Sequence, residues 1–234
     1  MKIAILETGV PPEGLEAQYG TYVQMFHRLV GEHEHAFTTY DAQAGELPDD
    51  PAAYDAVMVT GSPAGVYEDH AWIEPLKAFL RRAKGQTRLV GICFGHQIMA
   101  EAFGGRVEKS KNGWGLGLHR YDVCEHRSWM GAEPPAEIAI PVSHQDQVVE
   151  QPPASTVIAC SRFTPYAALA YDDQPAISFQ FHPEFDPAYA ARLIERRIRL
   201  QQVTGEHAEL ALESLHGADN RPIVAAWVRA FLAG

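Results

Sequence analysis

The chain has 234 residues, of which 46% are hydrophobic and 21% are charged, a balance typical of soluble globular proteins rather than disordered or fibrous ones. A chain of this length buries roughly 70% of the surface that its unfolded form exposes, so a core forms without disulfides or structural metal. Lysine and arginine number 19 against 30 acidic residues, and this net charge of −11 argues against nucleic acid as a partner.

The apolar runs are too short to span a bilayer, which takes roughly 20 residues, and the opening segment is too briefly apolar for a signal peptide. We therefore expect a cytoplasmic protein with no membrane partner. The three cysteines, Cys93, Cys124 and Cys160, give neither an even disulfide framework nor a C-x-x-C zinc half-site. Their spacing predicts three separate thiols, and we expect no metal site.

Strands and helices alternate in the first part of the chain. Apolar runs bounded by turn residues predict strands over Met1–Glu7, Ala36–Tyr40, Ala56–Thr60 and Arg88–Ile92. Apolar residues at helical spacing predict helices over Gln18–Val30, Trp72–Leu80 and Gly95–Phe103. Strands that are apolar on both faces and alternate with helices indicate a doubly wound α/β fold, with a mostly parallel sheet and helices on both faces. Ligands then bind beyond the carboxyl ends of the strands.

Beyond Gly105 the segments are shorter and are separated by glycine and proline. They predict hairpins and the last strands over Gly113–Val123, Ala136–Pro141, Thr156–Cys160, Ala167–Tyr171 and Ala176–Phe181. Asp186-Pro187 then predicts the start of a helix that ends near Thr204-Gly205. We expect one domain over residues 1–205 and a helical extension over 206–234, with helices at His207–Leu215 and Pro222–Leu232 packed on that domain.

The strongest local signal is the G-x-C-x-G segment from Gly91 to Gly95, which lies between a predicted strand and a predicted helix. This spacing matches a nucleophile elbow, a sharp turn that presents a side chain at the carboxyl edge of the sheet. The flanking glycines let the strand and the helix approach closely, and the helix N-terminus favours a thiolate. The alternative is that Cys93 is a buried structural cysteine.

His182-Pro183-Glu184 follows the last predicted strand, so His182 is expected at the same sheet edge as Cys93. The imidazole would serve as the base, and Glu184 would fix its tautomer and orient it. The alternative is a surface loop whose histidine and glutamate are merely solvated.

An oxyanion formed by thiolate attack on an amide needs N–H donors. The N–H of Phe94 and the loop Thr60–Gly65 could supply them, although a simple turn is the alternative for the loop. The polar segment Val142–Asp146 could line a pocket, although its composition alone predicts a loop. The sequence contains no dinucleotide or P-loop fingerprint, so we expect no cofactor.

Four motifs in order resemble the class I, or triad, glutamine amidotransferases, including the glutaminase domain of GMP synthetase and related stand-alone γ-glutamyl peptidases. They are GSP at Gly61–Pro63, GICFGHQ at Gly91–Gln97, SHQD at Ser143–Asp146 and FHPE at Phe181–Glu184. Their joint occurrence is specific, whereas any one of them alone would be weak. The resemblance implies the flavodoxin-like fold of that family.

The resemblance also implies a role for each motif. Cys93 would be the nucleophile, His182 the general base and acid, and Glu184 its orienting carboxylate. The oxyanion hole would consist of Gly61, Ser62 and Phe94. The glutamyl part of the substrate would be held by Gln97, Ser143, His144, Gln145 and Asp146. The family usually has Gly-Gly-Pro where this chain has Ser62, and a positive φ at that serine would cost about 1 kcal/mol. We expect His96 and His144 to be structural or pocket-lining.

Three functions remain open at this point. The first is hydrolysis of glutamine through a Cys93 thioester, which releases glutamate and ammonia. Any ammonia acceptor would be a separate synthase subunit, because residues 206–234 are too few for an acceptor domain of about 100 residues or more. The second is a stand-alone peptidase acting on γ-glutamyl peptides or conjugates. The third is a redox-responsive α/β binding protein, with Cys93 near Glu7.

Overall fold

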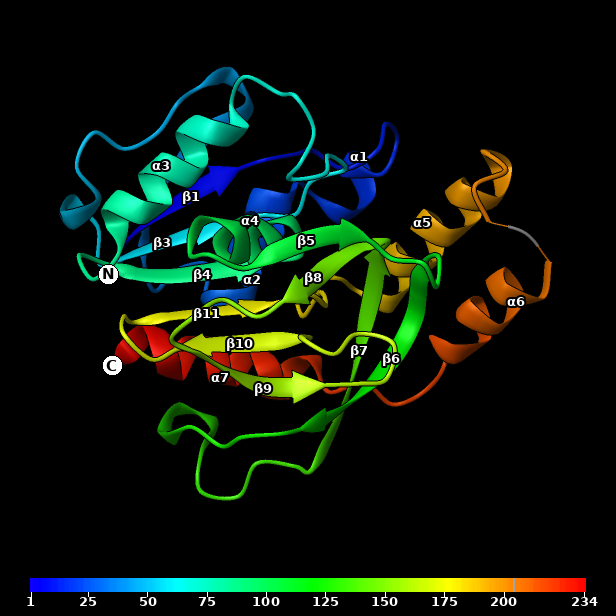
Figure 1. Cartoon of the computed structure of the whole chain (residues 1–234). Helices are drawn as coiled ribbons and strands as arrows, with labels where there is room; N and C mark the ends of the chain where they lie inside the picture. The colour runs from blue at the N-terminus through cyan, green and yellow to red at the C-terminus, as the bar shows by residue number, and fades with distance from the viewer. Residues whose placement is uncertain (204) are drawn as a thin grey trace.

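The computed structural model describes residues 1–203 and 205–234. Within these residues a nine-stranded sheet has the order β2-β1-β3-β4-β11-β10-β9-β6-β7 (Figure 1). The strands are β1 (Lys2–Glu7), β2 (Ala36–Asp41), β3 (Ala56–Val59), β4 (Arg88–Ile92), β6 (Gly115–Val123), β7 (Glu137–His144), β9 (Ser155–Cys160), β10 (Ala168–Tyr171) and β11 (Ala176–Phe179). The first five strands in this order, β2, β1, β3, β4 and β11, are parallel to one another. The other four, β10, β9, β6 and β7, extend the sheet with antiparallel pairing. A separate ribbon pairs β5 (Arg106–Lys109) with β8 (Asp146–Glu150).

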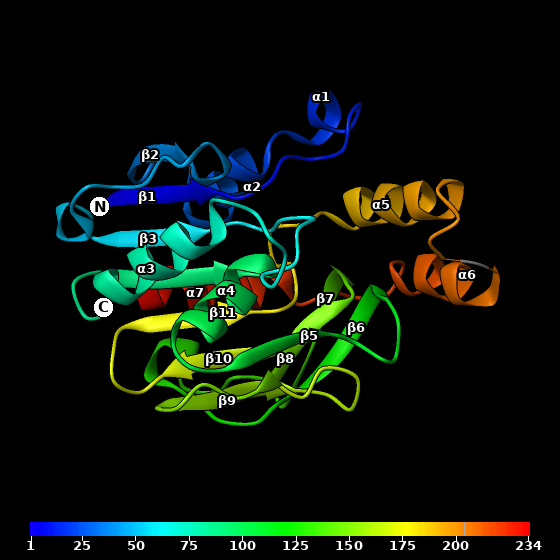
Figure 2. The ribbon, with the colours of Figure 1, turned by 45° about the horizontal axis from the view of Figure 1, so that its top comes forward.

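Helices cover both faces of the parallel strands (Figure 2). The helices are α1 (Glu16–Tyr19), α2 (Tyr22–Val30), α3 (Ile73–Ala83), α4 (Phe94–Ala102), α5 (Pro187–Arg199), α6 (Gly205–Ser214) and α7 (Arg221–Ala233), with short 3-10 turns at Ala42–Ala44, Pro51–Ala53 and Ser128–Met130. In β1, Ile3 and Ile5 pack with α2 and α7, whereas Ala4 and Leu6 pack with α3 and α4. Because alternate residues of one strand enter two apolar layers, the predicted doubly wound fold is confirmed.

Some predicted boundaries are wrong. The helix predicted over Gln18–Val30 is broken at Gly20, whose φ is +85°, and Thr21 starts α2 afresh. The Thr21 hydroxyl accepts from the Gln24 N–H while the Gln24 side chain accepts from the Thr21 N–H, so a capping box ends the first helix and begins the second. The segment Val142–Asp146, for which composition predicts a loop, instead contains the end of β7 and the start of β8.

The helix after β11 begins as predicted. Asp186 is its N-cap and accepts a 2.8 Å hydrogen bond from the Ala188 N–H. It ends at Arg199 rather than near Thr204-Gly205, and Thr204 lies outside the described residues.

The last two helices lie on different parts of the sheet. Helix α7 buries Val224, Trp227 and Val228 in the same apolar layer as α2, whereas α6 packs on β6. We propose that residues 1–205 form one domain and that residues 206–234 form a helical extension packed on it. In the described ranges, no helix has both the length and the apolar content to cross a membrane.

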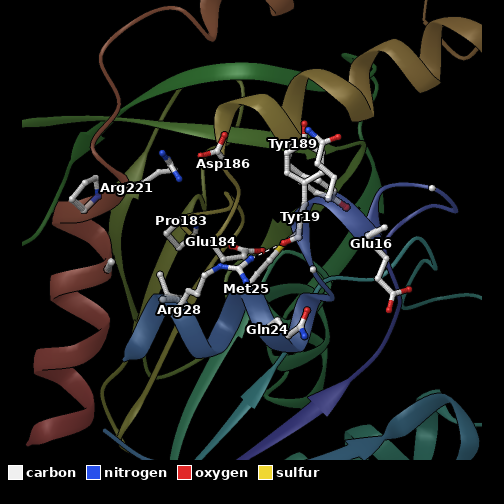
Figure 3. A pocket seen from close by; sticks show the side chains of 17 residues that line it. Glu16, Tyr19, Gln24, Met25, Arg28, Pro183, Glu184, Asp186, Tyr189 and Arg221 are labelled. Carbon is white, nitrogen blue, oxygen red and sulfur yellow. Dashed lines mark hydrogen bonds between the residues drawn. The ribbon is translucent and has the colours of Figure 1, made fainter. Parts of the chain in front are cut away.

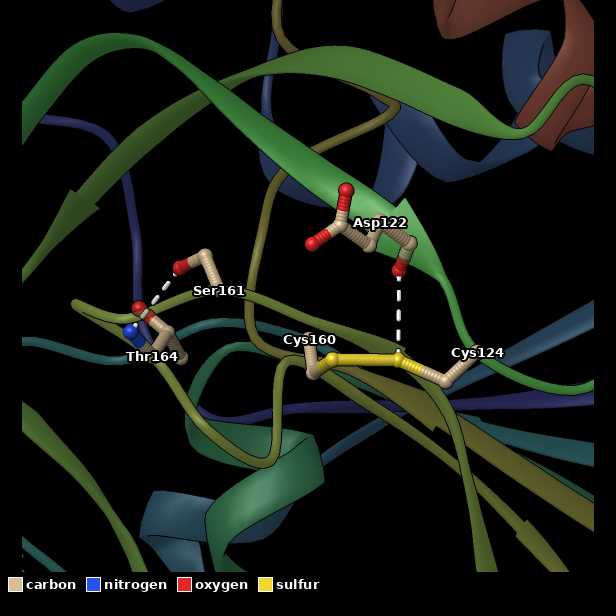
Figure 4. Close-up of a disulfide and its surroundings, with 5 residues drawn as sticks. All are labelled: Asp122, Cys124, Cys160, Ser161 and Thr164. Atoms are coloured by element: carbon tan, nitrogen blue, oxygen red, sulfur yellow. Dashed lines mark hydrogen bonds between the residues drawn. A yellow bond between two sulfur atoms is a disulfide. The ribbon is translucent and has the colours of Figure 1, made fainter.

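The prediction of three separate thiols is wrong, because Cys124 and Cys160 form a disulfide with their Cα atoms 6.5 Å apart (Figure 4). Strands β6 and β9 pair with Asp122 opposite Cys160, and this register brings the residue after β6 to the end of β9. The sheet order creates this proximity, so the 36-residue spacing of the two cysteines could not reveal it. Cys93 is a buried free thiol.

We expect the double variant Cys124→Ser/Cys160→Ser to lose about 2–4 kcal/mol of unfolding free energy, because the disulfide closes a loop of 36 residues in the unfolded chain. Urea denaturation measures the loss. Reduced wild type is the matched control and should resemble the variant. Equal unfolding midpoints for the oxidised wild type and the variant would contradict the expectation.

Candidate active site

Cys93 lies at the junction of β4 and α4 with φ 55° and ψ −103°. Such a positive φ is uncommon outside glycine and is typical of a nucleophile elbow. Glycines make the turn possible: a Cβ on Gly91 would lie 2.5 Å from the Gly95 backbone, and one on Gly95 would collide with the Val59 carbonyl. The turn therefore presents the Cys93 side chain beyond the carboxyl ends of the parallel strands.

His182 reaches the same edge from the neighbouring strand. Strand β11 pairs with β4, with Phe179 opposite Ile92, and the Cys93 N–H donates to the Phe179 carbonyl at 2.8 Å. The His182 Nδ1–H donates to Glu184 Oε1 at 2.7 Å, and the two side chains are 4% and 1% exposed. The imidazole also stacks on Phe185, with ring centroids 3.8 Å apart. These contacts fix the ring plane and leave Nε2 for the Cys93 sulfur.

The loop after β3 completes this wall. A Cβ on Gly61 would lie 3.4 Å from His182 Cε1 and 3.7 Å from Cys93 Cβ, so the missing side chain of Gly61 would point at both of these residues. Thr8, just after β1, holds the loop: its hydroxyl donates to the Thr60 carbonyl, and its N–H donates to the Thr60 hydroxyl, each at 2.9 Å. Sequence reasoning missed this support, whose signal is a threonine at the end of each of two adjacent strands.

Ser62 and Phe94, two of the predicted oxyanion donors, lie in different backbone settings. Positive φ among the described non-glycine residues is limited to Cys93, Ala154 and Gln201, so Ser62 carries no such strain. The Ser62 hydroxyl accepts from the Ala64 N–H at 3.1 Å. Phe94 is buried as the first residue of α4, where the N–H groups of a helix lack intrahelical acceptors.

The histidines differ sharply in charge. Burial lowers the pKa of His182, but the negative charges of Glu184 and Cys93 and the hydrogen bonds to them outweigh it and raise the pKa to about 10. Burial lowers the pKa of His96 and of His144 to about 3. At neutral pH His182 is therefore an imidazolium beside the cysteine, while the other two are neutral. His96 bonds to Ser178 Oγ at 2.8 Å, which fits a structural role.

A cavity of about 540 Å³ opens onto Cys93 and His182. It gathers most of the predicted site residues, namely Gly61, Ser62, Cys93, Gln97, Ser143, His144, Gln145, Asp146 and His182. Glu184 and Phe94 lie outside its lining. In the described part of the chain no group of three or more His, Cys, Asp or Glu side chains is placed to hold a metal ion.

A larger hollow of about 1240 Å³ lies on the other side of Glu184, between α1, α2 and the starts of α5 and α7 (Figure 3). Its lining includes neither Cys93 nor His182. Its two arginines are engaged by the protein: Arg28 donates to the Tyr19 carbonyl, and Arg221 donates to Asp219. The smaller cavity is therefore the candidate active site.

Gln97 and Gln180 form a chain of hydrogen bonds from the cavity wall to the Cys93 sulfur. The Gln97 amide donates to the Asp146 carbonyl at 2.8 Å and to Gln180 Oε1 at 3.1 Å. The Gln180 amide donates in turn to Cys93 Sγ at 3.7 Å, and Gln180 is fully buried. Sequence reasoning missed Gln180, for which the available signal was a polar residue at the end of an apolar strand.

The family model for class I glutamine amidotransferases matches residues 18–199. The chain belongs to the class I glutamine amidotransferases. It is 28% identical to γ-glutamyl peptidase 5 of Arabidopsis thaliana, over 86% of this chain and 82% of that protein. It is 32% identical to one subunit of the glutamine-hydrolysing GMP synthase of Ignicoccus hospitalis, over 71% of this chain and 84% of that protein. A glutamine amidotransferase from Thermotoga maritima has the same fold, with a TM-score of 0.78 at 19% identity over 100% of this chain and 99% of that one.

We expect the His182 imidazolium to lose its proton near pH 10, and Glu184→Gln to lower that midpoint by about one pH unit or more, because the neutral amide no longer stabilises the cation. NMR titration of the imidazole measures both midpoints. Glu195→Gln is the matched control, since Glu195 is a carboxylate of α5 that pairs with Arg192 on the surface. A midpoint shared by the wild type and Glu184→Gln would refute this role of Glu184.

Gln180→Leu should speed alkylation of Cys93 by iodoacetamide at neutral pH about twofold, because a thiolate that loses a hydrogen-bond donor worth about 1 kcal/mol becomes a stronger nucleophile. The rate is followed by intact mass. Gln174→Leu is the control, since Gln174 lies in the turn at the opposite end of β11. Equal rates for the two variants would show that the Gln180 amide does not act on the sulfur.

Proposed function

We propose that this chain hydrolyses γ-glutamyl amide bonds through a Cys93 thioester, with glutamine as the simplest substrate. The observation that carries the proposal is the convergence of Cys93, His182 and Gly61 on one wall of the 540 Å³ cavity, with Glu184 bonded to His182 from behind that wall. A nucleophile, an oriented acid–base group and adjacent backbone donors are the parts that amide hydrolysis requires.

The reaction follows from the charges of these groups. The Cys93 thiolate attacks the γ-carbonyl carbon, and the N–H groups of the Gly61–Ser62 loop and Phe94 stabilise the oxyanion. The His182 imidazolium protonates the leaving nitrogen as the C–N bond breaks, which leaves a γ-glutamyl thioester. Neutral His182 then takes a proton from water, whose oxygen attacks the thioester and releases glutamate. That proton restores the imidazolium as the thiolate departs, and Glu184 stays ionised throughout.

With glutamine as substrate the second product is ammonia. The similarity to a protein named as one subunit of a GMP synthase supports a separate synthase chain that accepts the ammonia. In this form the chain supplies ammonia and its partner consumes it.

The second candidate function is hydrolysis of γ-glutamyl peptides or conjugates. It is supported by the similarity to γ-glutamyl peptidases 2 to 5 of Arabidopsis thaliana, at 25–29% identity over 76–92% of this chain. The cavity also extends from Cys93 to side chains of α5, including Arg196 and Arg197, which leaves space for an amine larger than ammonia.

The test is glutamate release by the purified chain from glutamine and from a panel of γ-glutamyl dipeptides. We expect release in the wild type and none from Cys93→Ala, because the thioester cannot form without the sulfur. Preference for glutamine would favour the glutaminase, and preference for dipeptides the peptidase. Release that persists in Cys93→Ala, or no thioester and no release with any of these compounds, would overturn the proposal.

A further inference from the structure

Arg197 of α5 reaches into the cavity that holds Cys93. Its guanidinium lies over the Trp114 ring, 3.5 Å from the ring centroid. One terminal nitrogen donates to Ser143 Oγ at 3.3 Å, and the other donates to Gln202 Oε1 at 3.1 Å. The stacked ring and the two hydrogen bonds fix the guanidinium plane, so the group is held in place before any ligand binds.

The residues that contact this guanidinium are all neutral. Within residues 1–203 and 205–234, Arg197 has no carboxylate within ion-pair distance, and its Nε is buried without a hydrogen-bond partner. Arg192, one turn earlier, is exposed and pairs with Glu195. Burial lowers the pKa of Arg197 to about 10, so it remains a cation at neutral pH. A largely buried charge is costly unless it is paired.

The acidic side chains of the cavity belong to other elements. Glu13, Glu68 and Asp146 line it, and the Tyr67 hydroxyl donates to the Asp146 carboxylate at 3.0 Å. Each lies beyond ion-pair distance of Arg197. The negative charge of the Cys93 sulfur raises the pKa of Arg197 in the resting site, but that charge is lost when the sulfur forms the thioester, so it is no lasting counter-charge. An anion that arrives with the substrate would therefore complete the site.

We propose that Arg197 is the carboxylate-binding residue of this cavity and holds a carboxylate of the γ-glutamyl substrate. The inference rests on the proposed function. A guanidinium held flat against an aromatic ring presents its edge to a planar carboxylate, with which it makes paired hydrogen bonds. The carboxylate comes either from the α-carbon of the glutamyl group or from the leaving group of a γ-glutamyl amino acid. Both sources give the same chemistry at Arg197, and removal of one carboxylate at a time separates them.

The experiment compares three substrates in the full chain. γ-Glutamylglycine carries both carboxylates, γ-glutamylglycinamide lacks the one on the leaving group, and 4-aminobutanoylglycine lacks the one on the α-carbon. We expect Arg197→Met to lower kcat/KM at least tenfold for γ-glutamylglycine, and much less for the compound that lacks the carboxylate bound by Arg197. Arg192→Met is the matched control and should leave all three values unchanged.

The pattern of losses over the three substrates shows which carboxylate Arg197 binds. A loss that disappears with the glycinamide assigns Arg197 to the leaving group, and a loss that disappears with the aminobutanoyl compound assigns it to the glutamyl α-carboxylate. The same loss with all three substrates would overturn the inference, because Arg197 would then act on the fold or on Cys93.

Binding provides a second test that does not depend on turnover. In a Cys93→Ala background, calorimetry with γ-glutamylglycine should show at least tenfold weaker binding when Arg197→Met is added. Unchanged binding would overturn the inference about Arg197. If wild-type protein binds the compound but cleaves none of the substrates, the proposed function fails while the carboxylate site stands.

Discussion

The backbone at Cys93 is the constraint on which the site depends. A cysteine with φ 55° costs of order 1–3 kcal/mol, and this cost is borne only where the surrounding structure forces the turn. Here β4 leads directly into α4, and the packing of Gly91 against Gly95 and of Gly95 against Val59 allows no larger residue at either glycine. The Cys93 N–H is bonded to β11, so the strand that leads to His182 also anchors Cys93. The sheet therefore fixes the position of both side chains.

Burial alone does not set the charge of the histidines around Cys93. Three histidines are buried near the cysteine, yet burial keeps His96 and His144 neutral while the carboxylate of Glu184 makes His182 a cation. The same desolvation therefore yields opposite protonation states, depending on whether a carboxylate lies beside the ring. The site therefore places one charged imidazole next to the sulfur and keeps the other two rings neutral.

Much of the fold was predictable because the parallel strands are apolar on both faces. The limits of β4 were predicted to the residue, since its run of apolar residues lies between the polar Gln86-Thr87 pair and the turn at Cys93. The motif residues Cys93 and His182 were predicted at one sheet edge, and the structure brings them together. The ribbon of β5 and β8 was missed, because these short strands bury few side chains and carry little periodic signal.

Contacts between distant segments could not be predicted in the same way. The Cys124–Cys160 disulfide, the Gln180 hydrogen bond to Cys93 and the stacking of Arg197 on Trp114 each join residues 36 or more positions apart. Such pairs depend on which strands are neighbours and on their register, neither of which is encoded in local periodicity. The family motifs identify the residues that line the candidate site, and they carry no information on the side chains that support those residues.

The place of β11 in the sheet has a consequence for how the protein is made. This strand lies between β4 and β10, so the centre of the sheet stays open until the ribosome has released residues 176–179. Until then Cys93 lacks its neighbour His182 and β4 has an unpaired edge. The nascent chain therefore carries the Cys93 thiol without its imidazole partner until the last gap in the sheet closes.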